Sequence, residues 1–79
     1  MPLFYFHICK GDIRVCDREG VELPDLEAAR AEALEDAREM MSDAVRGGLD
    51  ISERHIEIEI ETGEIVVVVP FASALTKET

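Results

Sequence analysis

The sequence predicts an α+β domain with the element order β-β-α-β-β, in which a four-stranded antiparallel sheet carries one long helix on one face. The observations behind it are an aromatic segment that returns after a turn, a helical apolar stripe, and an alternating segment that leads into a valine run. A chain of 79 residues provides one small domain with a thin core. We expect this domain at residues 1–72 and a flexible tail at residues 73–79.

The first predicted hairpin begins with the segment LFYFHIC at residues 3–9, whose aromatic and Ile content favours a strand. Gly11 and Asp12 predict a two-residue turn, after which residues 13–17 return as the second strand. In that register Ile8 faces Val15, although a three-residue loop would shift the pairing. A second turn at residues 17–20 leads into a short extended piece at residues 21–23.

The predicted helix begins after Asp25, a good N-cap residue, and runs to about Arg46, where two glycines end it. Its apolar stripe is rich in alanine, which lets a helix approach a sheet closely. The stripe comprises Leu26, Ala29, Ala33, Ala37, Met40 and Ala44, widened by Leu34, Met41 and Val45.

Arg30 falls inside this stripe on a helical wheel, where a charge must reach solvent or find a partner. The expected partners are Asp17, Glu19 and Glu22, which lie in the segment just before the helix. We therefore expect a structural ion pair between Arg30 and one of these carboxylates. An arginine that binds an anion is the alternative.

The second predicted hairpin alternates strictly from residue 54, with Ile56, Ile58 and Ile60 on one face. Thr62 and Gly63 predict a two-residue loop, and residues 64–71 return as the last strand. In that register Ile60 faces Ile65, Ile58 faces Val67 and Ile56 faces Val69. On the other face, Glu57, Glu59 and Glu61 would lie about 7 Å apart along one strand. They are interpreted as a solvated face that discourages aggregation, in preference to a cation site.

One helix covers only one face of a four-stranded sheet. The open face includes Tyr5, His7, Val66 and Val68. Tyr5 and His7 add apolar area with polar tips, a composition typical of interfaces. These four residues are the candidate interface. We expect a homodimer through this face or through the exposed edge beside the valine run.

The net charge of −10 argues against partners that need a basic surface, such as nucleic acid and anionic membranes. The longest apolar stretch is too short to cross a bilayer, and no secretory signal is evident. The two cysteines are too few for a disulfide framework. We expect a cytoplasmic protein with reduced thiols.

Candidate chemistry is sparse. His7, Cys9 and Cys16, with His55 nearby, are ligand types that zinc accepts, but their spacing fits no known zinc motif. We therefore expect no metal, no cofactor and no stoichiometric zinc. Neither cysteine is followed by an oxyanion turn, and a chain of this size has little room for a cleft of several hundred Å³. An enzyme is disfavoured.

Motifs along the whole chain carry a family resemblance: Tyr5-Phe6-His7, Gly11-Asp12, Asp17 with Gly20, the helix entry from Glu22 to Arg30 with Ala33, and Val69-Pro70-Phe71. With these motifs the chain resembles an uncharacterised family of short alphaproteobacterial proteins known only as a domain of unknown function. The resemblance implies a fold but no activity, and Cys9 and Cys16 lie outside the family's pattern. A weaker similarity to HicB-type antitoxins rests on a hairpin that leads into a helix with an acidic cap.

The biological role therefore stays unknown at this level. The function best supported by the sequence is a small acidic interaction module that self-associates through the open sheet face or edge. The alternative is an antitoxin-like or regulatory partner of a basic protein, which rests on the acidic charge.

Overall fold

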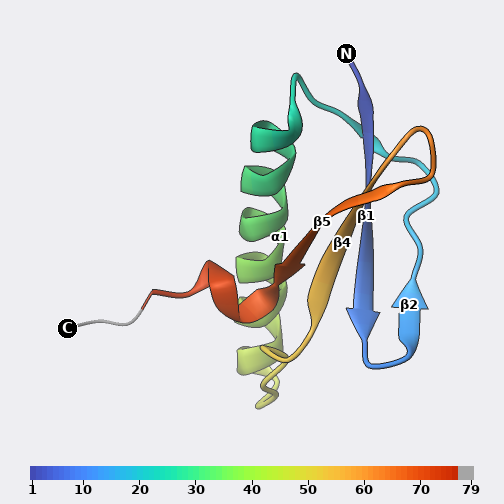
Figure 1. Ribbon diagram of the computed structural model, residues 1–79. Coiled ribbons are helices and arrows are strands. Elements are labelled where there is room, and N and C mark those ends of the chain that lie inside the picture. Colours follow the sequence, from blue (N-terminus) through green and yellow to red (C-terminus); the bar gives the residue numbers. More distant parts are fainter. Residues whose placement is uncertain (77–79) are drawn as a thin grey trace.

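The computed structural model describes residues 1–76 and has one long helix packed on one face of an antiparallel sheet (Figure 1). The helix is α1 (Leu26–Arg46), and the strands are β1 (Leu3–Lys10), β2 (Ile13–Val15), β3 (Val21–Glu22), β4 (His55–Ile60) and β5 (Ile65–Pro70). The strand order is β2-β1-β4-β5, and β3 pairs with β1 as well. The α+β class is confirmed. The expected count of four strands is corrected to five.

The N-terminal hairpin follows the predicted register. Gly11 takes a left-handed φ of 56°, which a two-residue turn between β1 and β2 requires. Ile8 faces Val15, as expected. The fifth strand is the short extended piece after the second turn, because its backbone pairs with the start of β1. Two short strands thus share one edge of β1, separated by residues 16–20.

The two hairpins join through β1 and β4, which pair antiparallel along nearly their whole length. Phe6 faces Ile58 and Ile8 faces Ile56, so the apolar side chains of both strands lie on the helix side. Cys9 lies directly opposite His55 on the other side. This long-range pairing sets which polar side chains meet on the open face.

The register of the second hairpin departs from prediction near its loop. The expected pairs Ile56–Val69 and Ile58–Val67 are confirmed, but Ile65 faces Glu59 and not Ile60. A β-bulge places one extra residue of β5 at this point, so the faces of the strand exchange beyond it. Val66 consequently packs against the core, and Ile65 shares the face of Glu59.

The helix begins and ends where the sequence predicts. Asp25 accepts a hydrogen bond from the Ala28 N–H at 2.8 Å, and Gly48 takes a left-handed φ of 79° after the last turn. The alanine stripe contacts the sheet through Ala29, Ala33 and Ala37, which are fully buried. The buried stripe is shorter than predicted, because Leu26 and Val45 in the end turns are 40% and 68% exposed.

The core lies between α1 and the middle of the sheet. Its most buried large side chains are Ile56, Ile58, Val69 and Phe71. Phe71 belongs to a short 3₁₀ helix, η1 (Phe71–Ala74), which packs on α1. The tail predicted at residues 73–79 thus starts inside η1, where Ala74 is buried, and its residues 77–79 lie outside the described residues. Within residues 1–76, no helix has the length and apolar character that crossing a membrane requires.

Candidate functional site

The sheet face opposite the helix carries two polar clusters. The first, which we call the His7 cluster, joins His7, Asp17 and Glu59. The second, which we call the Cys9 cluster, joins Cys9, Arg14, His55 and Glu57. Both clusters combine side chains of the N-terminal hairpin with side chains of β4.

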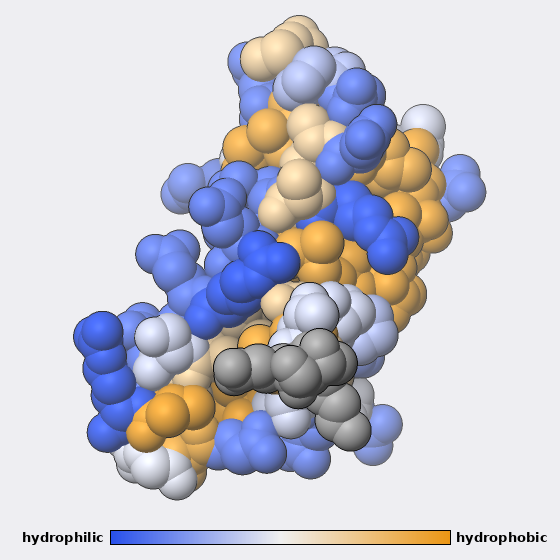
Figure 2. All heavy atoms as spheres, turned by 90° about the vertical axis from the view of Figure 1, so that its left-hand side faces the viewer, coloured by the Kyte–Doolittle hydropathy of each residue, from blue (hydrophilic) through white to orange (hydrophobic). Residues whose placement is uncertain are grey.

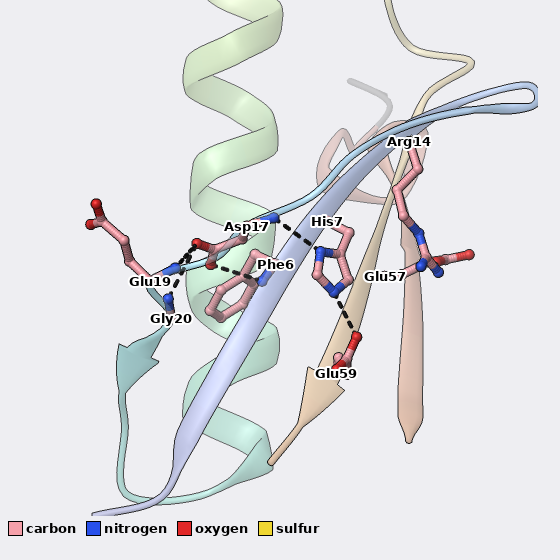
Figure 3. A network of polar contacts seen from close by, with 8 residues as sticks. All are labelled: Phe6, His7, Arg14, Asp17, Glu19, Gly20, Glu57 and Glu59. Atoms are coloured by element: carbon pink, nitrogen blue, oxygen red, sulfur yellow. Dashed lines mark hydrogen bonds and ion pairs between the residues drawn. The ribbon is translucent and has the colours of Figure 1, made fainter. Parts of the chain in front are cut away.

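The His7 cluster fixes the tautomer of its histidine (Figure 3). His7 is only 5% exposed, and its Nδ1 lies 3.0 Å from the backbone N of Asp17. A backbone N–H can only donate, so Nδ1 is unprotonated and accepts. The proton therefore lies on Nε2, which donates to the Glu59 carboxylate at 2.8 Å. With both ring nitrogens engaged, His7 holds the loop after β2 against the sheet.

Asp17 replaces a strand partner where the edge of β1 lies between β2 and β3. One carboxylate oxygen accepts from the Phe6 N–H at 3.2 Å, and the other accepts from the N–H groups of Glu19 and Gly20 at 3.1 and 3.2 Å (Figure 3). Burial raises the pKa of the Asp17 carboxyl, but these three donors outweigh it and hold the pKa below its ordinary value. Asp17 is thus a structural residue of the loop.

The Cys9 cluster surrounds a guanidinium group. Arg14 donates to the carboxylate of Glu57, which lies beside it in Figure 3, and is the cross-strand partner of Cys9 in the first hairpin. His55 Nε2 lies 3.5 Å from the second carboxylate oxygen of Glu57. The hydrogen bond from Arg14 lowers the pKa of Glu57, whereas burial raises the pKa of the Cys9 thiol. One ligand atom each of Cys9, His55 and Glu57 lies within 4.8 Å of the others.

The four predicted interface residues do not form one apolar patch. Tyr5 is half-buried and His7 is buried between its two hydrogen-bond partners. Val66 packs against the core because of the bulge. Val68 stays 54% exposed, opposite Glu57. A dimer contact through this face would therefore bury mainly polar groups.

The expected Arg30 ion pair is absent from residues 1–76. Arg30 is exposed and forms no salt bridge with Asp17 or Glu22 among the described residues, and Glu22 is itself exposed in β3. The helix presents the line through Ala29 to the sheet, and the next residue lies about 100° around the helix axis. The helical wheel placed Arg30 in the apolar stripe, but its position about 100° from Ala29 directs its side chain to solvent.

The three glutamates of the second hairpin are more engaged than the sequence suggested. Glu57 binds Arg14, Glu59 binds His7, and Glu61 accepts from the Leu3 N–H at 3.0 Å. The expectation of a merely solvated face is thus corrected. These contacts could have been predicted by pairing β4 with the first strand, because His7 and the glutamates then share one face of the sheet.

Two open grooves flank the helix, although the sequence predicted little room for a cleft of several hundred Å³. The larger, of about 520 Å³, lies along the C-terminal half of α1 beside Ile51 and Leu75. The second, which we call the acidic groove, has a volume of about 430 Å³. Its walls combine apolar and acidic side chains: Phe6, Ile8, Val21, Met40, Asp17, Asp36, Glu39 and Asp43. On the helix-bearing side of the molecule, hydrophilic side chains lie between hydrophobic areas (Figure 2).

A small sheet with one helix and a polar open face defines a fold but no activity. The chain belongs to the family described as Domain of unknown function (DUF6894), whose profile matches residues 3–72. This confirms the resemblance to a family of unknown function. No curated protein and no solved structure gives a significant match.

Proposed function

We propose that this protein is a small acidic interaction module that forms a homodimer through the outer edge of β5. The supporting observation is the position of β5 at the end of the sheet. Ile60 N–H donates to the Glu64 carbonyl, so the even-numbered residues of β4 direct their backbone groups toward β5. By the same alternation, Val68 directs its N–H and C=O outward, and an exposed apolar edge of this kind favours pairing with another strand.

The edge is a better dimer contact than the open face. The bulge turns Val66 toward the core, and the charged groups of the face are already paired within the chain. Pairing β5 with its own copy around a two-fold axis would extend the sheet without burying those charges. The proposed dimer therefore forms through the edge of β5 and not through a flush contact between two open faces.

A second candidate function is favoured by the acidic groove. Its floor is apolar, while Asp36, Glu39 and Asp43 project from one side of the helix. Burial raises the pKa of Asp36, and the neighbouring carboxylates Glu32, Glu39 and Glu35 raise it further. A basic amphipathic segment would relieve this crowding and cover the floor. This supports the regulatory or antitoxin-like alternative, in which the partner is a basic protein.

The proposed module is cytoplasmic and non-enzymatic, and its proposed alphaproteobacterial origin is what the family resemblance implies. Nucleic acid and anionic membranes are not proposed as partners, because the net charge of −10 repels both. The grooves are assigned to binding, since neither lining combines a nucleophile with a histidine base.

The dimer is tested by light scattering of the full chain at micromolar concentration. We expect twice the chain mass of 8.8 kDa. Val68→Pro should give a monomer, because proline removes the outward donor while edge positions tolerate it within a strand. Val68→Lys is the matched control and should leave an edge-paired dimer intact.

A monomeric wild-type chain would contradict the proposal, as would a dimer that survives Val68→Pro in a folded variant. Loss of the dimer in Val68→Lys would instead assign the contact to the face. For the second candidate, calorimetry with a lysine-rich amphipathic peptide should show binding that Glu39→Lys weakens. Equal binding by both proteins would remove the acidic groove from consideration.

A further inference from the structure

We propose that the Cys9 cluster is a metal site, in which Cys9, His55 and Glu57 bind one Zn²⁺ through a thiolate, an imidazole and a carboxylate. Zinc takes all three donor types, and three protein ligands with one open position are typical of zinc sites that also hold water. The sequence alone favoured no metal, because these residues have no motif spacing. The pairing of β1 with β4 brings them together.

The distances are close to those a zinc ion needs. Cys9 lies directly opposite His55, and Glu57 lies two residues further along β4 on the same face. His55 Nε2 and Glu57 Oε2 are 3.5 Å apart, whereas tetrahedral zinc with bonds of about 2.1 Å separates such ligands by about 3.4 Å. All three ligand atoms lie within 4.8 Å of one another. Small side-chain rotations would bring the Cys9 sulfur and the other two ligand atoms to bonding distance from one ion.

A positive charge already occupies this position. The Arg14 guanidinium hydrogen-bonds Glu57, and Arg14 lies directly opposite Cys9 in the first hairpin, so two of the proposed ligands lie beside a cation. The Arg14 side chain is 42% exposed and lies on the edge strand β2, so it can rotate into solvent. A surface ion pair contributes little to stability. A metal ion can therefore displace the guanidinium, and Arg14 competes with the metal for the same donors.

The site differs from the set of ligand types noted in the sequence. His7 is unavailable, because both of its nitrogens are hydrogen-bonded within the His7 cluster. Cys16 is exposed, while Cys9 is only 4% exposed within the sheet. These two cysteines therefore provide a matched pair of variants, one at a proposed ligand and one away from it.

The test titrates the full-length chain with Co²⁺, a spectroscopic substitute for Zn²⁺. Tetrahedral Co²⁺ bound to a thiolate absorbs in the visible and near ultraviolet, so the spectrum reports both geometry and the cysteine ligand. We expect saturation at one equivalent and displacement by Zn²⁺. The thiolate band should vanish in Cys9→Ser and persist in Cys16→Ser. His55→Ala should weaken binding at least about tenfold, and Arg14→Gln should strengthen it.

Three results would overturn the proposal. One is the lack of a tetrahedral spectrum in the wild-type chain with excess Co²⁺. Another is a thiolate band that is lost in Cys16→Ser but kept in Cys9→Ser. The third is unchanged affinity in both His55→Ala and Arg14→Gln. Should Cys9→Ser fail to fold by circular dichroism, the His55 and Arg14 variants decide, because neither side chain is buried.

Discussion

Replacing Asp17 by alanine should destabilise the domain by about 2–3 kcal/mol. One carboxylate satisfies three backbone N–H groups, of Phe6, Glu19 and Gly20. The same residue also donates from its backbone to His7, so it joins the loop after β2 to the edge of β1. No other side chain among the described residues makes as many hydrogen bonds to backbone donors.

The magnitude follows from where each donor lies. Phe6 is 8% exposed, so its N–H would lose its acceptor at a buried position, at a cost of about 1–3 kcal/mol. Glu19 is exposed, and water can replace the carboxylate at its N–H. Gly20 is half-buried and adds about 0.5 kcal/mol. Most of the loss thus comes from one unsatisfied donor.

Urea unfolding at neutral pH measures this loss. With a slope of about 1 kcal/mol per molar urea for so small a domain, the midpoint should fall by roughly 2–3 M. Glu19→Ala is the control, because its side chain lies in the same loop but is exposed. Equal midpoints for Asp17→Ala and Glu19→Ala would refute the assigned role of the carboxylate.

The same carboxylate should make stability depend on pH in a defined direction. Its pKa in the folded protein lies below the ordinary value of 3.8, so the unfolded chain binds the proton more tightly. Its stabilising contribution is complete above about pH 4 and is lost as the pH falls through the folded-state pKa. Asp17→Asn should remove this part of the acid dependence.

Two further variants test the loop and the helix. Gly20→Ala should cost about 1–2 kcal/mol, because Gly20 has a φ of 74° and an added Cβ would lie 2.9 Å from Tyr5 Cε1; an unchanged urea midpoint would disprove this strain. Arg30→Ala should change stability by less than about 0.5 kcal/mol, since the side chain is exposed. A loss of 2 kcal/mol or more, of about the size expected for a partly buried ion pair, would restore the original expectation for Arg30.

Elements with a strong local signal could be predicted. The alternation around Ile56 and Ile58 identifies β4, the spacing of Ala29, Ala33 and Ala37 identifies the buried face of α1, and Asp25 marks its start. In each case the period of side-chain burial matches the geometry of one element. The hairpin at Gly11 follows from turn chemistry in the same way.

The predictions that were wrong concern contacts between segments that are distant in the sequence. Nothing near Val66 in the sequence signals an extra residue in β5, because the bulge forms only when the strand pairs with β4 and packs on the core. The exposure of Arg30 depends on how the helix rotates against the sheet. Likewise, Cys9 meets His55 only because the two hairpins join through their inner strands. Local sequence patterns therefore could not predict the candidate metal site.

The pairing of β1 with β4 also affects the order in which the domain can fold. It closes a loop of roughly 45 residues, for which chain entropy opposes closure by about 3 kcal/mol. The helix and the first hairpin are local and can form earlier, but Phe4 and Phe6 then lack the isoleucines that cover one side of them. On a ribosome, this aromatic pair stays accessible until residues 55–60 have emerged. A nascent chain of this protein is thus most vulnerable to aggregation before its fourth strand has emerged from the ribosome.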